Sequence, residues 1–215
     1  MGQTAAAVGH GRIEHLAGIE GRAERLAALL IPAPLRGARH VVVVVVAVAR
    51  WLLDHFDIKT ADYLGYSMGA RTGVRAMIDF PKRLRRVVLG GIGWGGAFHA
   101  AEDIAKALRG EPTTSPVAKT FLDFAKGRPS NDLEALAACI LGPQPEPDRS
   151  ELASIKNPVL VVVGDQDDIV AEVDRLVESI PTARLVTIAG RNHMSAVPAK
   201  EFKQAVLDFL EASSS

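Results

Sequence analysis

The sequence has 215 residues, enough for one large domain or for one domain with a small insertion. Nearly half of it is hydrophobic (48%), which supports a buried core and excludes a disordered chain. Lys plus Arg and Asp plus Glu both number 25, so no basic excess favours nucleic acid or an anionic membrane as a partner. A single cysteine excludes an internal disulfide and fits a reducing, cytoplasmic compartment.

The first 55 residues predict two helices. The chain start shows no charged segment followed by a long apolar run, so no signal peptide is expected, and the longest apolar run is too short to span a bilayer. Apolar residues recur at helical spacing over 13–30 and predict a helix there. Six consecutive valines favour a strand by propensity, but they lead into the helical pattern ARWLLDHFDI, so we predict a helix over about 44–55.

From residue 61 onwards, strand-like and helix-like segments alternate. Four short runs that end at or near glycine are typical of buried parallel strands. They cover 61–66, 86–89, 159–163 and 183–189. Helical patterns cover 70–80, 170–180 and 199–212, and the first two end before a proline. This alternation predicts an α/β fold with a mostly parallel sheet flanked by helices.

Residues 97–153 interrupt this alternation. Three helix-like stretches follow one another there, and no strand pattern lies between them. Asn131 and Asp132 precede the third stretch as candidate caps. The proline-rich segment LGPQPEPDRS then leads back to the sheet. We therefore predict a core made of 1–96 and 154–215, and a small helical cap or lid made of 97–153.

The motif GYSMG places Ser67 between a predicted strand and a predicted helix. A serine hydroxyl becomes a useful nucleophile only beside a general base, with backbone N–H groups aimed at the oxyanion that forms. A tight strand-to-helix turn requires small flanking residues, and Gly65 and Gly69 occupy these positions. The start of the helix also makes the Met68 N–H a candidate oxyanion donor. The alternative is an ordinary strand-to-helix turn without a nucleophile. The strand pattern before Ser67 and the helix pattern after it make that alternative less favoured.

Two later loops supply a candidate acid and a candidate base. Asp165, Asp167 and Asp168 follow the most apolar predicted strand, where one of them can orient an imidazole and another can cap the next helix. His193 lies in a glycine-led loop after the following strand. The order serine, aspartate, histidine is that of the α/β-hydrolase arrangement. The other histidines show no such loop context and no metal-ligand spacing, so neither a metal nor an organic cofactor is predicted.

Over about 51–209 the chain resembles the α/β-hydrolase superfamily. The resemblance rests on the segments DYLGYSMGAR, RRVVLGGIGW, NPVLVVVGDQDDIV and GRNHMSAV. It implies that Ser67 is the nucleophile and His193 the base. It selects Asp167 as the acid, because the family's acid usually lies three residues after the glycine that ends its strand, and it leaves Asp168 as the reserve. The predicted helical insertion matches the usual position of the family's cap.

The N-terminal part departs from the family pattern. Family members begin with two or three strands, the last of which runs into His-Gly, and the N–H that follows completes the oxyanion hole. His10-Gly11 matches this pair, which implies the Arg12 N–H as the second donor, but the first two strands are expected to be missing. A sheet without them exposes an edge strand, so we also predict a homodimer in which a partner chain covers that edge.

Together these features predict a serine hydrolase that cleaves small carboxylic esters through an acyl-enzyme. Trp94, Phe98, Phe121 and Phe124 are candidate pocket residues, with core packing as the alternative for each, and Cys139 is expected to be a buried apolar residue. Two other functions stay open. One is another activity of the family, such as that of a lactonase, a C–C hydrolase or a perhydrolase, and the other is a hydrolase-like binding protein with weak or no activity.

Overall fold

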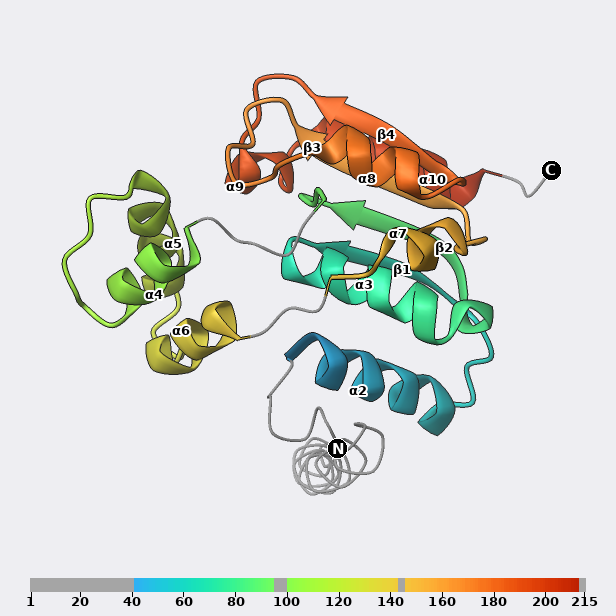
Figure 1. The fold of residues 1–215 in the computed structure, drawn as a ribbon, viewed down its shortest axis with the longest axis horizontal. Coiled ribbons are helices and arrows are strands. Elements are labelled where there is room, and N and C mark those ends of the chain that lie inside the picture. The colour runs from blue at the N-terminus through green and yellow to red at the C-terminus, as the bar shows by residue number, and fades with distance from the viewer. Residues whose placement is uncertain (1–40, 95–99, 143–145, 213–215) are drawn as a thin grey trace, which may run out of the picture.

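The computed structural model describes residues 41–94, 100–142 and 146–212, with only the backbone for 41–44 (Figure 1). The helix predicted near the N-terminus, the expected loss of early strands and the second oxyanion donor all fall outside these ranges. No helix within them is long and apolar enough to cross a lipid bilayer.

Four parallel strands form the centre of the described fold. They are β1 (Ala61–Tyr66), β2 (Leu84–Gly90), β3 (Val159–Gly164) and β4 (Ala183–Ile188), hydrogen-bonded in the order β1-β2-β3-β4. Each of the four predicted strands is present, with small differences at its ends. Because the strands are parallel, their carboxyl ends meet at one edge of the sheet, where loops carrying polar side chains come together.

β3 shows why a central strand is apolar throughout. All six of its residues are buried, since helices cover both faces of the sheet at its centre. Val159, Val161 and Val163 belong to one apolar core, and Leu160 and Val162 belong to the other. This division follows the two-residue period of a strand, in which neighbouring side chains point to opposite faces.

β1 and β4 are the outer strands of the described sheet. Leu64, in the middle of β1, is 49% exposed, whereas the next residue, Gly65, is buried. An apolar side chain on an outer strand is a feature that a partner chain can cover. The homodimer expected from the sequence stays a prediction.

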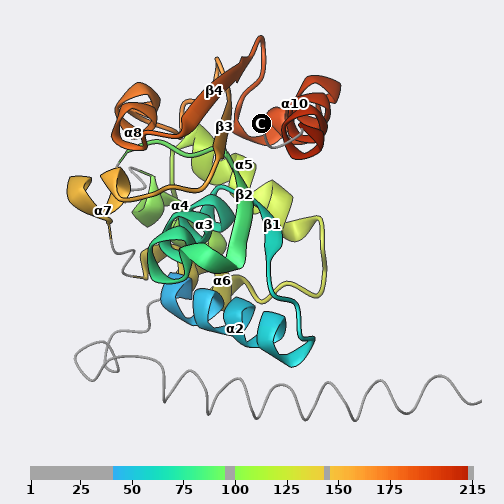
Figure 2. The same ribbon diagram turned by 90° about the vertical axis from the view of Figure 1, so that its right-hand side faces the viewer.

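Helices cover the two faces of the sheet (Figure 2). α3 (Met68–Asp79) and α8 (Val173–Ser179) lie on one face, and α10 (Lys200–Glu211) lies on the other. α2 (Val41–His55) packs against α3 and takes in the whole run of valines. The helix predicted over about 44–55 is therefore present, and it begins three residues earlier, at Val41.

Three further helices lie apart from the sheet, beyond the carboxyl ends of its strands (Figure 1). They are α4 (Ala101–Leu108), α5 (Pro116–Lys126) and α6 (Leu133–Leu141), and their buried side chains form an apolar cluster of their own. Asp132 caps α6 by accepting a hydrogen bond from the Ala135 N–H over 3.0 Å. The division of the chain into a core and a cap stays a prediction.

Short helices complete the described chain. α7 (Arg149–Ala153) leads from the separate helices back to the sheet, and its Leu152 is buried in the same core as α3 and α8. η2 (Pro81–Arg83) joins α3 to β2, and α9 (His193–Ala196) follows β4. The sequence patterns did not predict these short helices, because single turns carry too little periodicity to be recognised.

α8 begins three residues later than the sequence predicts. The expected start was residue 170, but the helix starts at Val173. Glu172 has a left-handed backbone with φ of 50°, which cannot continue into a right-handed helix. Its carbonyl accepts the first helical hydrogen bond, from the Leu176 N–H, and also one from the Trp94 N–H, both over 3.3 Å, and the second ties this loop to the segment after β2.

Candidate active site

Ser67 lies at the turn between β1 and α3, at the carboxyl edge of the sheet. Its backbone has φ of 54° and ψ of −113°, a conformation that L-residues rarely adopt and that costs about 1–3 kcal/mol. The Ser67 N–H donates to the carbonyl of Gly90 in β2 over 2.8 Å, so the neighbouring strand helps to hold the turn. A strained turn between a strand and a helix is the conformation that the GYSMG motif predicts.

The two glycines of the motif differ in the space that a side chain would have. A Cβ on Gly65 would lie 2.3 Å from the carbonyl oxygen of Gly69, inside the turn itself, so only glycine fits there. A Cβ on Gly69 would meet no atom within 4 Å outside its own helix and chain neighbours. The expectation that both flanks must be small is therefore wrong for Gly69, whose helical position leaves open space around the Cα atom.

His193 and Asp167 form a buried pair. The distance from His193 Nδ1 to Asp167 Oδ2 is 2.8 Å, and their side chains are only 4% and 1% exposed. An ionised carboxylate can only accept hydrogen bonds, so this pairing places a proton on Nδ1 and leaves the Nε2 lone pair for another partner. Loops after β3 and β4 thus bring together the two residues that the sequence assigned as acid and base.

The other two aspartates of the β3 loop take different positions. Asp165 is exposed, and its Oδ1 accepts a hydrogen bond from the Gly190 N–H over 2.7 Å, which ties the loop after β3 to the loop after β4. Asp168 is exposed as well. The remaining oxygen of Asp167 accepts a backbone N–H of its own loop over 3.2 Å, which fixes the carboxylate. Asp167, and not the reserve Asp168, is therefore the partner of His193 in the structure.

Two residues that sequence reasoning missed hold His193 in place. Asn192 caps α9 by accepting hydrogen bonds from the backbone N–H groups of Met194 (3.2 Å) and Ser195 (3.0 Å), so His193 begins a helix instead of lying in the expected loop. The Tyr66 hydroxyl donates to the His193 carbonyl over 2.7 Å, and the two rings lie 5.1 Å apart. Because Tyr66 directly precedes the serine, this hydrogen bond ties the histidine to the turn.

Met68 is the first residue of α3. Its N–H therefore has no intrahelical partner and lies at the positive end of the helix. This is the position that the sequence assigned to one oxyanion donor. The other assigned donor, the Arg12 N–H, lies outside the described residues. Within the described ranges, no three His, Cys, Asp or Glu side chains are grouped so that they could hold a metal ion.

Two side chains near the pair have shifted pKa values. Burial, and to a smaller extent the charge of Asp167, raises the pKa of Tyr66 far above its ordinary range, so its hydroxyl stays a hydrogen-bond donor. Burial lowers the pKa of the Arg71 guanidinium, and the attraction of Glu146 opposes this shift. Arginine remains charged in proteins. Arg71 is therefore a fixed positive charge one helical turn from Ser67.

Two cavities open at Ser67. The smaller, of about 20 Å³, is lined by both Ser67 and His193 and by segments after β2 and β3. The larger, of about 420 Å³, lies between the serine turn and helices α4 to α6, and we call it the large cavity. Most of its lining is apolar, and this part comprises Met68, Leu108, Phe121, Phe124, Ala125, Leu136 and Ile140. The serine thus has access to a space shared with the histidine and to a wider space beneath the separate helices.

The predicted pocket residues divide between these cavities. Phe121 and Phe124 line the large cavity, and Trp94 lines the small one. Phe98 lies outside the described residues. The expectation that Cys139 is buried is wrong, because α6 turns this residue towards the large cavity, where it is half-buried.

Known proteins resemble this chain in sequence. A family model described as the alpha/beta hydrolase fold matches residues 32–138. The chain is 29% identical over 178 residues to 3-oxoadipate enol-lactonase 2 of Acinetobacter baylyi, covering 72% of this chain and 65% of that protein. It is 32% identical over 192 residues to 2-hydroxy-6-oxononadienedioate/2-hydroxy-6-oxononatrienedioate hydrolase 2 of Pseudomonas putida, covering 74% of this chain and 66% of that protein.

A solved structure resembles the fold. The crystal structure of the enol-lactonase from Burkholderia xenovorans LB400 superposes with a TM-score of 0.65 at 25% identity, covering 80% of this chain and 73% of that one. This chain belongs to the α/β-hydrolase superfamily. The α/β-hydrolase fold that the sequence motifs predicted is thereby confirmed. The chain spans just under two thirds of the length of the two curated relatives, 65% and 66%.

Proposed function

We propose that this α/β-hydrolase is a serine hydrolase that forms an acyl-enzyme on Ser67. One observation carries the proposal: His193, which is paired with the buried Asp167, lines the same cavity as the strained Ser67 turn. In the proposed mechanism, His193 Nε2 takes the proton of the Ser67 hydroxyl while the oxygen attacks the carbonyl carbon. The Asp167 carboxylate holds the required tautomer beforehand and stabilises the imidazolium that forms.

The remaining steps use groups at the same edge of the sheet. The oxyanion rests on the Met68 N–H, where the partial positive charge of α3 adds to the stabilisation. The bond to the leaving group then breaks, and the leaving oxygen takes the proton from the imidazolium. Water, deprotonated by His193, attacks the acyl-enzyme and releases the acid together with free Ser67. In this proposal α4 to α6 act as the cap, and the large cavity holds the body of the substrate.

The relatives favour a narrower substrate class than open-chain esters. One is named as an enol-lactonase, and an enol-lactone is a cyclic ester that the steps above cleave without change. We therefore propose an enol-lactone as the first substrate class. A second candidate is hydrolysis of a C–C bond in a hydroxy-oxo dienedioate, and the 32% identity with the Pseudomonas putida hydrolase favours it.

A fluorophosphonate probe tests the proposed nucleophile directly. Wild-type protein should be labelled on Ser67, whereas Ser67→Ala should give no adduct by mass spectrometry. Turnover of 3-oxoadipate enol-lactone, of 2-hydroxy-6-oxononadienedioate and of a 4-nitrophenyl ester then separates the substrate classes. A wild-type protein that stays unlabelled and hydrolyses none of the three would contradict the proposal and favour a hydrolase-like binding protein.

A further inference from the structure

Arg71 is a positive charge that the proposed mechanism does not use. It lies on α3 one helical turn after Ser67, and its backbone N–H donates to the Ser67 carbonyl over 3.2 Å. The half-buried side chain lines the small cavity together with Ser67 and His193, and it also lines the large cavity. A substrate bound at Ser67 therefore lies in a space that Arg71 also lines.

This position is electrostatically costly for a cation. The first turn of a helix carries a partial positive charge, so an arginine there is modestly disfavoured and gains from a nearby anion. Partial burial adds to the cost, which is why the pKa of Arg71 is lowered. A site with this charge, shielded from part of the solvent, favours a bound anion.

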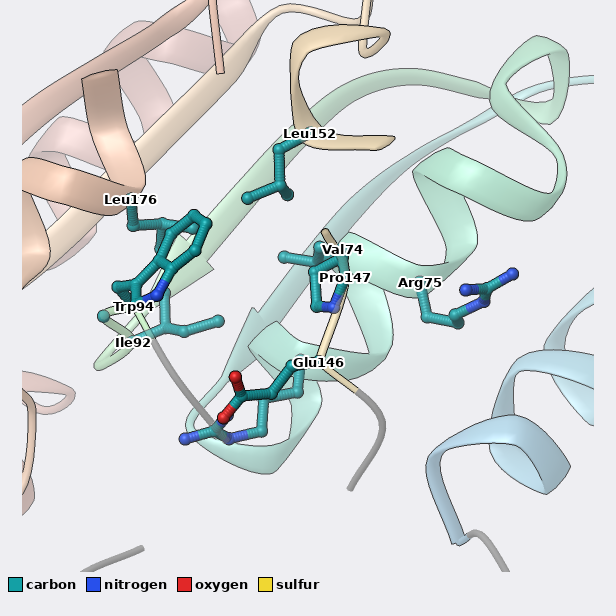
Figure 3. Close-up of a pocket in the computed structure, with 10 residues that line it drawn as sticks. Val74, Arg75, Ile92, Trp94, Glu146, Pro147, Leu152 and Leu176 are labelled. Atoms are coloured by element: carbon teal, nitrogen blue, oxygen red, sulfur yellow. The ribbon is translucent and has the colours of Figure 1, made fainter. Parts of the chain in front are cut away.

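In the structure, Glu146 supplies part of the negative charge that Arg71 attracts. Glu146 is exposed and lies on the segment that returns from α6 to the sheet. Both residues line a third cavity, of about 40 Å³, next to the small one. Figure 3 shows Glu146 beside Pro147 on this segment, below the apolar side chains of Val74 and Leu152. An anion on the substrate would compete with Glu146 for the same guanidinium.

The large cavity indicates what such a ligand looks like. Its lining is mainly apolar, apart from Ser67, Arg71, Asn131 and Arg128, and Arg128 is exposed. A short carbon chain fits this lining, and a carboxylate at its end can reach an arginine. A guanidinium binds a carboxylate with good geometry, because its planar fork can donate two parallel hydrogen bonds to the two oxygens.

We propose that Arg71 binds a free carboxylate of the substrate, so that the site prefers esters or lactones that carry one, and that Glu146 competes with this carboxylate. This proposal depends on the proposed function in one respect only: it takes Ser67 to be the residue that attacks the ester bond of the substrate. Arg71 acts as the residue that determines specificity, since it lies in the cavity of the reacting serine. Arg128 at the exposed side contributes less, because solvent screens its charge.

A matched pair of esters measures the preference. 4-Nitrophenyl hydrogen glutarate carries a free carboxylate, and 4-nitrophenyl pentanoate has a similar chain without one. After subtraction of the uncatalysed rates, the wild-type ratio of kcat/KM should favour the carboxylate ester by about tenfold to a hundredfold. Arg71→Gln should bring this ratio close to one, and Arg71→Lys should restore part of it, because lysine keeps the charge but not the bidentate geometry.

Two other variants give effects that a loss of folding cannot imitate. Glu146→Gln removes the competing carboxylate, so it should lower KM for the glutarate ester severalfold and leave the pentanoate ester almost unaffected. Arg75→Gln is the matched control on the same helix. The Arg75 guanidinium pairs with Asp79 and Glu151 and points away from Glu146 and Trp94, so this variant should keep the wild-type ratio (Figure 3).

A binding measurement keeps the inference separate from the hydrolase proposal. Ser67→Ala protein, which the proposed mechanism predicts to be inactive, should bind the glutarate ester at least tenfold more tightly than the pentanoate ester by calorimetry. Adding Arg71→Gln should abolish that difference. Failure of the wild type to label at Ser67 would overturn the proposed function alone. Equal binding of the two esters, no binding at millimolar concentration, or an unchanged ratio in Arg71→Gln would overturn the role of Arg71.

Discussion

His193 Nδ1 lies 2.8 Å from Asp167 Oδ2, and the two side chains are among the least exposed polar groups of the described chain, at 4% and 1%. They come from loops that follow different strands, β3 and β4. Burying a charged carboxylate without a partner is costly, so its hydrogen bond to the imidazole both stabilises the loops and fixes the orientation of the ring. One contact therefore serves folding and the proposed chemistry together.

Replacing Asp167 with asparagine should separate these two roles. The amide keeps the shape of the carboxylate, but its NH₂ group donates to Nδ1 and places the ring proton on Nε2, where it blocks acceptance of the serine proton. We expect kcat for a 4-nitrophenyl ester to fall by about 10⁴. Asp168→Asn is the control, because Asp168 is exposed, and it should stay within about threefold of wild type. Equal losses in the two variants would show that Asp167 does not orient the base.

Two tyrosines of β1 allow a matched test of how the histidine is positioned. The Tyr66 hydroxyl donates to the His193 carbonyl over 2.7 Å, and the Tyr63 hydroxyl donates to the Gly69 carbonyl over the same distance. Each Tyr→Phe change should cost about 1 kcal/mol in the free energy of unfolding, measured with urea. Only Tyr66→Phe should also lower kcat, by about tenfold, because it loosens the backbone of the proposed base.

The result that would count against this account is a loss of kcat in Tyr63→Phe as large as in Tyr66→Phe. Such a result would mean that the activity follows the stability of the β1 region and not the position of His193. A circular-dichroism spectrum of each variant provides the control for folding.

The strands were predictable because the apolar residues of each segment match the burial of that segment in the sheet. β3 is buried on both faces, so its sequence is apolar at every position, and no knowledge of its neighbours is needed to recognise it. The pairing of Asp167 with His193 was predictable for a related reason. Parallel strands deliver their following loops to one edge of the sheet, so the order of Ser67, Asp167 and His193 along the chain already indicates proximity.

The missed features depend on contacts between distant parts of the chain. The hydrogen bond from Tyr66 to His193 joins residues 127 positions apart, and no spacing rule connects them. α8 begins later than predicted because Glu172 takes a left-handed backbone conformation, which no helical periodicity reveals. The open space around Gly69 likewise depends on how α3 packs, so the motif alone could not distinguish it from Gly65.

Alanine variants of the two glycines in the GYSMG motif allow a second comparison, this time of stability. Gly65→Ala places a Cβ 2.3 Å from the Gly69 carbonyl oxygen, which is backbone and cannot move without opening the turn. This variant should lose about 3 kcal/mol or more of unfolding free energy. Gly69→Ala meets no such obstacle and adds a better helix former to α3, so its stability should equal or exceed that of wild type by up to about 1 kcal/mol. Urea titrations check both, and similar losses in the two variants would contradict the geometry of the turn.

The large cavity can be tested through Cys139, the only cysteine of the chain. This residue is half-buried and lines the cavity that also contains Ser67, so alkylation with N-ethylmaleimide should place bulk in the proposed path of the substrate. We expect the modified protein to lose roughly half or more of its ester turnover, since the added group fills part of the cavity of about 420 Å³ that the substrate has to enter. Each protein is compared with its own untreated sample, and mass spectrometry gives the extent of labelling.

Cys139→Ser provides the control, because it should not respond to the reagent. A small carboxylate ester present during treatment should slow the alkylation of the wild type, since it occupies the same space. A fully alkylated wild type that hydrolyses esters at its original rate would show that substrate reaches Ser67 by another route.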